Sequence, residues 1–115
     1  MTEYFRSLDA LAVFSREKAA KVDVVPGRHL FVGLNCFEPG QLQSVHVHAG
    51  SDKFYLVLSG KARMVVGNEE REVGSGTLVW APAELAHGVR EALERTIMLV
   101  AMAPPPAGVS SRKTP

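Results

Sequence analysis

The sequence lacks the features that mark several large classes of protein. It has one cysteine, Cys36, so no disulfide can form within the chain, and this suits a reducing compartment. Its formal net charge is only +1 and no basic stripe is present, which leaves no electrostatic footprint for nucleic acid or an anionic membrane. The longest apolar runs are six or seven residues long, against the roughly 20 that a membrane-spanning helix needs.

The segment Met1–Ala10 carries charged residues and has no apolar core of the kind a signal peptide requires. We therefore expect a cytoplasmic globular protein that binds neither nucleic acid nor membrane. Its 115 residues suit one compact domain, and 46% apolar with 22% charged residues is an ordinary composition for one.

Helix signals are confined to one short segment, Ser7–Phe14. Leu8, Leu11 and Ala12 are spaced for one face of a helical turn, and Ser7 is a suitable N-cap. The rest of the chain reads as a series of short β-type runs separated by Gly- and Pro-containing turns. The runs are Lys21–Val25, His29–Phe37, Ser44–His48, Phe54–Ser59, Ala62–Val66, Arg71–Val73, Thr77–Ala81, Gly88–Arg90 and Thr96–Ala101.

Around eight strands without intervening helices favour an all-β antiparallel sandwich or barrel and exclude a βαβ fold. A jelly-roll barrel fits that strand count. We divide the chain into an N-terminal helix and leading strand (1–25), a barrel (26–103) and a flexible C-terminal tail (104–115) that has too little apolar mass to order itself.

Two runs, Phe54–Leu58 and Ile97–Ala101, are apolar without alternation. Such strands need cover on both faces. The inside of a barrel covers one face and a neighbouring chain could cover the other, so we expect a homodimer. Cys36, on a run with Val32 and Leu34, is interpreted as a buried small hydrophobe.

Three of the four histidines are arranged in a way that suggests a metal site. His46 and His48 are two apart on one predicted strand, so their side chains leave the same face. His87 follows Pro82, where another strand begins. Three neutral imidazoles would bind a divalent transition metal and leave open positions on it. Taken alone, the pair is weak, because two polar residues on a solvated face give the same pattern. His29, beside a turn, is interpreted as a loop-edge residue.

Two longer motifs strengthen the interpretation. The segment Gly40 to His48, followed by Phe54 to Gly60, resembles the first motif of the cupin superfamily. Gly76, then Pro82 and His87, resembles the second motif. The resemblance covers roughly residues 26–103. It implies a double-stranded β-helix, also called a cupin barrel, in which His46, His48 and His87 are the metal ligands, and in which Gly40, Gly60, Gly76 and Pro82 are turn positions.

The sequence departs from these motifs at the fourth ligand, a glutamate. Lys53 stands in its place, and Glu84 stands where the second motif has a glycine. A unit charge about 5 Å from a divalent ion is repelled by roughly 6–7 kcal/mol at an effective dielectric of about 20. Lys53 could therefore swing away, stay as a neutral amine that acts as a base, or pair with an anionic ligand in a site that holds no metal. Asp52 could replace the glutamate through a bulge, but a solvated loop carboxylate is the simpler interpretation.

These residues support two hypotheses of function. The first is a metal-dependent enzyme of the dioxygenase, isomerase or decarboxylase type on a small organic substrate, with Fe, Mn, Ni or Zn and with Lys53 as its catalytic residue. The alternative is a non-catalytic cupin that binds a small anionic ligand through Lys53. Tyr55, Val57 and Trp80 either line the cavity or form the core, and we favour the core. The fold itself does not select a reaction.

Overall fold

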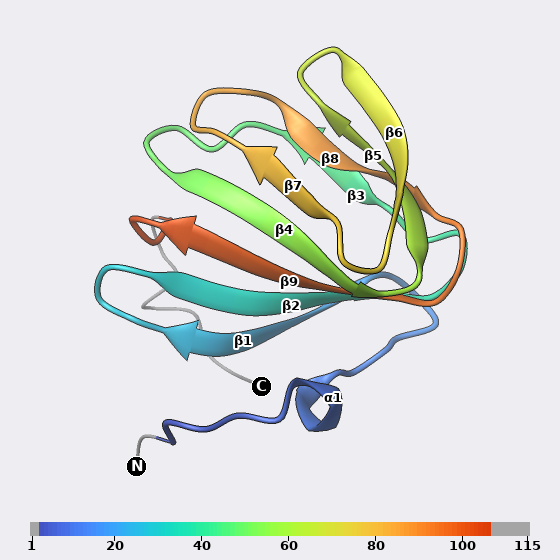
Figure 1. Cartoon of the computed structure of the whole chain (residues 1–115). Coiled ribbons are helices and arrows are strands. Elements are labelled where there is room, and N and C mark those ends of the chain that lie inside the picture. Colours follow the sequence, from blue (N-terminus) through green and yellow to red (C-terminus); the bar gives the residue numbers. More distant parts are fainter. Residues whose placement is uncertain (1–2, 107–115) are drawn as a thin grey trace.

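The structure, a computed structural model, describes residues 3–106 (Figure 1). Most of the predicted tail, residues 107–115, lies outside this range. One short helix and nine strands make up the secondary structure of the described residues. They are α1 (Leu8–Leu11), β1 (Ala20–Pro26), β2 (Phe31–Phe37), β3 (Gln43–His46), β4 (Asp52–Ser59), β5 (Lys61–Val66), β6 (Glu69–Gly74), β7 (Leu78–Ala81), β8 (His87–Ala92) and β9 (Thr96–Ala103).

The strands form two antiparallel sheets that face each other (Figure 1). One sheet has five strands in the order β1-β2-β9-β4-β7, and the other has four in the order β3-β8-β5-β6. Neighbours far apart in sequence, such as β2 and β9 or β3 and β8, pair directly. The predicted all-β jelly roll with a short N-terminal helix is confirmed. No helix among residues 3–106 is long and apolar enough to cross a bilayer.

Side chains alternate between the two faces of the five-stranded sheet, as the pleat requires. Tyr55 and Val57 of β4 point inward and are fully buried with Met98 and Phe37, as predicted. Trp80 was expected in the core, and that expectation is wrong: it is 52% exposed. Its partner across the ladder is Phe54, on the outer face of β4, so the register of β7 turns the indole outward.

The N-terminal helix covers part of that outer face. Ser7 is its N-cap, and its side chain accepts a hydrogen bond from the amide of Ala10 at 3.4 Å. Leu8 and Leu11 pack with Leu34 and the buried Cys36. Burial raises the pKa of the Cys36 thiol, which fits the predicted role of a small hydrophobe. The helix therefore stays in place by burying its apolar side, since four residues alone are too few to form a stable helix.

The motif glycines stand at turns. Gly40, Gly60 and Gly76 have φ angles of 89°, 92° and 88°, in the left-handed region. At Gly60, in the turn from β4 to β5, a Cβ would also collide with the carbonyl oxygen of Arg95 and the side chain of Thr96. The turn that connects the two sheets through β4 and β5 therefore requires glycine at position 60, because a residue with a Cβ would collide there.

Each strand differs from its predicted run by one or two residues at one end or both, and two of these differences bear on the site. β2 begins at Phe31 rather than at His29, because the amide of Gly27 donates to the carbonyl of Leu30 and closes a turn there. β3 ends at His46 rather than at His48. Beyond it, the carbonyl of His48 accepts a hydrogen bond from the amide of Glu84 at 3.1 Å, so the chain leaves the ladder before His48.

Candidate metal centre

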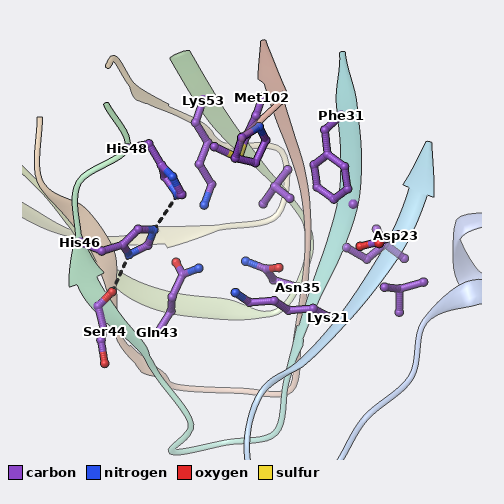
Figure 2. Close-up of a pocket in the computed structure, with 15 residues that line it drawn as sticks. Lys21, Asp23, Phe31, Asn35, Gln43, Ser44, His46, His48, Lys53 and Met102 are labelled. Carbon is purple, nitrogen blue, oxygen red and sulfur yellow. Dashed lines mark hydrogen bonds between the residues drawn. The ribbon is translucent and has the colours of Figure 1, made fainter. Parts of the chain in front are cut away.

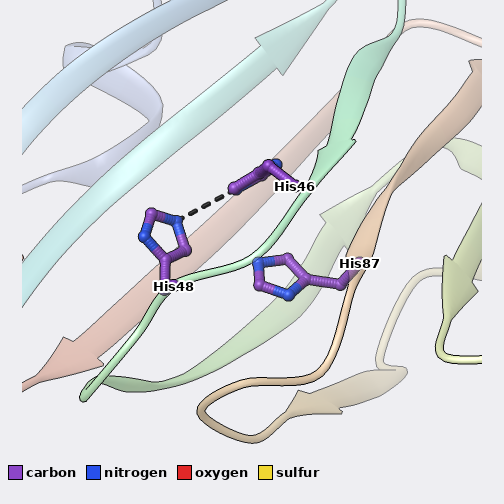
Figure 3. A group of neighbouring side chains, drawn as sticks. All are labelled: His46, His48 and His87. Carbon is purple, nitrogen blue, oxygen red and sulfur yellow. Dashed lines mark hydrogen bonds between the residues drawn. The ribbon is translucent and has the colours of Figure 1, made fainter.

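The three predicted histidines lie close together although they come from two strand ends and a loop (Figure 3). His46 is the last residue of β3, His48 lies in the following loop, and His87 is the first residue of β8. β3 and β8 pair with His46 directly opposite His87, which fixes the separation of those two rings. His29 is exposed in the β1–β2 turn and is not part of this group.

The ring nitrogens are close enough to share an ion. One ligand nitrogen from each of His46, His48 and His87 lies within 4.8 Å of the others. The Nε2 atoms of His46 and His48 are 3.0 Å apart. Two nitrogens bound at right angles to one ion, each at about 2.0–2.1 Å, are separated by about 2.9 Å. The pair therefore already has the spacing of two ligands on one metal.

Backbone carbonyls hold two of the rings. Nδ1 of His46 lies 2.8 Å from the carbonyl oxygen of Ser44, and Nδ1 of His87 lies 2.9 Å from that of Leu85. A carbonyl only accepts, so each Nδ1 carries the proton and each Nε2 presents a lone pair. His87 is 1% exposed, and its Nε2 atom has no hydrogen-bond partner among the described residues. A buried, unpaired acceptor of this kind is costly, and a metal ion would satisfy it.

The electrostatics keep all three imidazoles neutral near pH 7. Burial lowers the pKa of each one, and the positive charge of Lys53 lowers it as well. For His48 these causes together lower the pKa to about 4. Neutral imidazole is the form that binds metal, so the rings need not lose a proton first.

A reciprocal pair of carboxylates holds the two loops that carry His48 and His87 together. The Glu84 carboxylate accepts a hydrogen bond from the amide of Gly50 at 3.0 Å, and the Asp52 carboxylate accepts one from the amide of Ala83 at 2.9 Å. Glu84 has a φ of 72°, the left-handed conformation that suits the glycine of the motif. Asp52 is exposed and engaged with Ala83, and it is not one of the three grouped ligands.

Lys53 is the fourth prominent residue of the site. It lies on the inner face of β4, is 4% exposed, and places its Nζ atom 4.4 Å from the ring centroid of Tyr55. Burial and the charge of Lys21 lower its pKa to about 8, so the side chain is still mostly protonated at pH 7. Of the three outcomes considered above, swinging out of the barrel is not what this structure shows.

His46, His48 and Lys53 line a cavity of about 340 Å³, and His87 is not one of its lining residues (Figure 2). This is at the lower end of the range for small-molecule sites. Polar side chains enter it from four strands, and Figure 2 shows those of Lys21, Asn35, Gln43 and Lys53 pointing toward its interior. Apolar residues, among them Phe31, Val100 and Met102, line the rest.

Sequence reasoning missed Lys21, Asn35 and Gln43 as cavity residues. Lys21 lies opposite Asn35 in the β1–β2 ladder, and Tyr55 binds Gln43 through its hydroxyl group. One signal was readable: Asn35 interrupts an otherwise apolar run, Phe31–Phe37. A polar residue in the middle of a buried strand needs a partner, and none is evident in sequence.

Comparisons with known proteins agree with this architecture. The sequence pattern described as "Cupin domain" matches residues 33–102. An uncharacterized protein of Streptomyces coelicolor is 37% identical over 78 residues, which cover 68% of this chain and 73% of that protein. A crystal structure of a protein from Thermus thermophilus is 39% identical, with a TM-score of 0.85 over 90% of this chain and 100% of that one.

The double-stranded β-helix is also supported by a solved structure. A conserved protein of Klebsiella pneumoniae with a double-stranded β-helix domain has a TM-score of 0.82 at 24% identity, over 90% of this chain and 91% of that one. That likeness concerns the fold alone. The matched pattern spans most of the barrel, from β2 to β9. The chain therefore belongs to the cupin family and is a small cupin domain.

Proposed function

We propose that this cupin binds one divalent transition metal through His46, His48 and His87 and acts on a small organic substrate in the adjoining cavity. The observation that carries the proposal is the Nε2 atom of His87, which is buried without a hydrogen-bond partner among the described residues. It faces a pair of histidines whose Nε2 atoms are already 3.0 Å apart. A purely structural histidine in a barrel core would have a partner on both ring nitrogens.

The donor set fits three of the four metals predicted from sequence. Neutral imidazoles suit Fe, Ni and Zn, whereas Mn prefers oxygen ligands, and three imidazoles leave coordination positions open. When bound, such an ion would supply Lewis-acid activation, or joint binding of substrate and a small co-reactant. The protein's own contribution is to fix two ring tautomers through the Ser44 and Leu85 carbonyls, and to place Lys53 and Gln43 around the substrate.

Lys53 is the proposed catalytic residue. Its Nζ atom borders the cavity, and its lowered pKa, about 8, gives it both a protonated and a neutral form near neutrality. A group with such a pKa is suited to hold a proton for a substrate or to remove one. The reaction class, whether of the dioxygenase, isomerase or decarboxylase type, follows from the substrate and is left to activity screens.

The second candidate is capture of a small anionic ligand without catalysis. It is favoured by the same Lys53, which is a buried cation with no counter-ion among the described residues. The two candidates differ in turnover and in dependence on metal. Ligand binding that survives complete removal of metal, with no product from any substrate, would favour capture.

The decisive test is elemental analysis of untagged protein and of three variants. We expect about one equivalent of transition metal per chain in the wild type. His46→Ala and His87→Ala remove ligands and are expected to lose it, whereas His29→Ala is the matched control and is expected to retain it. His29 is exposed and lies outside the group of three.

A wild type that stays free of metal after incubation with iron, manganese, nickel and zinc salts would refute the proposal. So would a metal content that His87→Ala leaves unchanged. Circular dichroism of each variant checks that the barrel has folded, so a loss of metal is attributed to a lost ligand.

A further inference from the structure

Two polar side chains inside the barrel have no partner among the described residues. Lys53 is 4% exposed, and among residues 3–106 it makes no hydrogen bond and no ion pair. Its ammonium group makes a cation–π contact with the ring of Tyr55. Asn35 is also 4% exposed, and its side-chain amide makes no hydrogen bond to any described residue. Both border the cavity. Among the described residues, the one fully buried side-chain polar atom without a hydrogen-bond partner is Nε2 of His87, so the polar atoms of Lys53 and Asn35 reach the cavity. A cation and an amide that face a partly apolar cavity without a protein partner favour a polar ligand there.

A third polar side chain, Gln43, is held with its amide NH₂ group facing the same cavity. Tyr55 donates its hydroxyl proton to Oε1 of Gln43 at 2.6 Å. In this hydrogen bond the amide oxygen of Gln43 faces the tyrosine. The NH₂ group of Gln43 is then turned toward the cavity, on the side of Lys53 and Asn35 (Figure 2).

A second cation stands at the rim. Lys21 lies on the edge strand β1, opposite Asn35 in the ladder, and is exposed to solvent. Its positive charge lowers the pKa of Lys53. Asp23, two residues along the same face, brings one negative charge to the lining. Two lysines against one aspartate leave the lining positive, and a metal ion would add to that excess.

We propose that this cavity binds the carboxylate group of a small organic acid, with the carboxylate held by Lys53, the Gln43 amide and Asn35, and drawn in by Lys21. This inference rests on the proposed function in one respect: the other end of the acid would face the three histidines and their metal. The contacts to the carboxylate group do not require the metal. It thus assigns a substrate class to the site.

The chemistry of the lining favours carboxylate over other anions. One ammonium and planar amide donors match the two in-plane oxygens of a carboxylate. Sites for phosphate groups use arginine forks or the backbone amides of a helix N-terminus. Neither lines this cavity among the described residues. Its apolar wall of Phe31, Val100 and Met102 leaves room for the hydrocarbon part of an acid.

The test measures binding of simple acids to protein stripped of metal with EDTA and to protein reloaded with zinc. Acetate, succinate and benzoate are compared with acetamide, succinamide and benzamide, which have similar shapes and no charge. We expect at least one acid to raise the Tm and to bind saturably by calorimetry in the stripped protein, and its amide to do neither. Zinc is expected to tighten the binding.

Variants locate the contact. Lys53→Met keeps the length of the side chain and is expected to weaken the acid at least tenfold, and Lys21→Met a few-fold, with the Lys21 effect disappearing at high salt. Lys61→Met is the control, since Lys61 is a half-exposed surface residue paired with Glu72. If Lys53→Met does not fold, Asn35→Leu replaces it, with an expected loss of several-fold.

The outcomes separate this proposal from the metal proposal. Equal binding of acids and amides, no binding of any of the three acids, or an unchanged affinity in both Lys53→Met and Asn35→Leu would overturn it. Metal content is measured on the same samples. If the protein holds metal but binds acids no better than amides, the metal proposal stands and the carboxylate proposal is refuted. If it binds acids without taking up any metal, the carboxylate proposal stands and the metal proposal is refuted.

Discussion

The inner and outer faces of the five-stranded sheet are built from alternate residues of the same strands, and they differ in chemistry. On the inner face, β1, β2 and β4 present Lys21, Asn35 and Lys53 to the cavity. On the outer face, the residues between them are apolar, and Leu34 is fully buried with residues of the N-terminal segment. Both faces gain stability from apolar burial, but the inner face also gives up some stability to keep these three polar groups available for a ligand.

The largest effect is expected from breaking the outer face. Leu34→Ala removes a side chain that is 0% exposed, and the surrounding strands cannot close the space, so we expect a loss of about 2–5 kcal/mol in the free energy of unfolding. Urea denaturation measures it. Leu30→Ala, at a position that is 45% exposed, is the control and should cost far less. Equal losses in the two variants would show that Leu34 contributes no more to the core than the exposed Leu30.

The inner face should respond with the opposite sign. Lys53→Met replaces a buried cation by an apolar chain of similar length, so we expect the metal-free variant to be more stable than the wild type at pH 7. The pKa of Lys53 falls from 10.5 to about 8 on folding, which sets an upper bound of about 3 kcal/mol on the gain from removing the charge. Chemical denaturation at several pH values measures the difference between the two proteins.

The pH dependence of that difference distinguishes charge from packing. Between about pH 8 and 10.5 the folded wild type binds fewer protons than the unfolded chain, so its stability rises with pH over this window. The advantage of Lys53→Met should therefore be full below pH 8 and shrink as the pH rises. Tyr55 titrates in both proteins and cancels in the comparison. A pH-independent difference would mean that folding leaves the pKa of Lys53 unchanged, so that burial in the barrel does not penalise its charge.

A smaller effect is expected at the loops that bridge the two sheets. Glu84→Ala keeps a side chain at a φ of 72° but removes the acceptor for the Gly50 amide, so we expect a loss of about 1 kcal/mol and several-fold weaker zinc binding. Glu84→Gly loses the same acceptor but relieves the backbone, so it should be the more stable of the two. If the zinc affinity of Glu84→Ala equals that of the wild type, Glu84 does not help to position His48.

The smallest effect on folding, and the one that tests the predicted homodimer, concerns the outer face beyond α1. Leu78 and Trp80 are each more than half exposed there, beside Phe54 of β4. If a second copy covers this patch, Trp80→Ser will shift the protein from dimer to monomer in light scattering, with a change of less than about 0.5 kcal/mol in the monomer's stability. A wild type that is monomeric at all concentrations would refute the homodimer.

The sequence predicted all nine strands and the three histidines because both depend on local signals: turn residues, alternation and two spaced motifs. The sequence also showed that Lys53 occupies the position where the first motif has a glutamate ligand. Trp80 was placed wrongly because its direction depends on the register of β7 against β4, and register between distant strands is not written in either strand alone.

The cavity residues escaped prediction for a related reason. Lys21 and Asn35 become neighbours only when β1 pairs with β2, and Gln43 joins them only through the hydroxyl group of Tyr55. The loop contacts of Glu84 and Asp52 likewise join segments more than thirty residues apart. Departures from the motif, Lys53 and Glu84, were visible in sequence, but their consequences depend on three-dimensional neighbours.

The outward position of Trp80 has a practical consequence for spectroscopy. It is the chain's one tryptophan, and more than half of its surface is open to solvent. Its fluorescence therefore reports on the outside of the sheet and is a poor indicator of events around the histidines. The emission of the folded chain should resemble that of an indole in water and should be readily quenched by iodide. A shift to shorter wavelength with protection from iodide as concentration rises would be a label-free signature of the patch being covered.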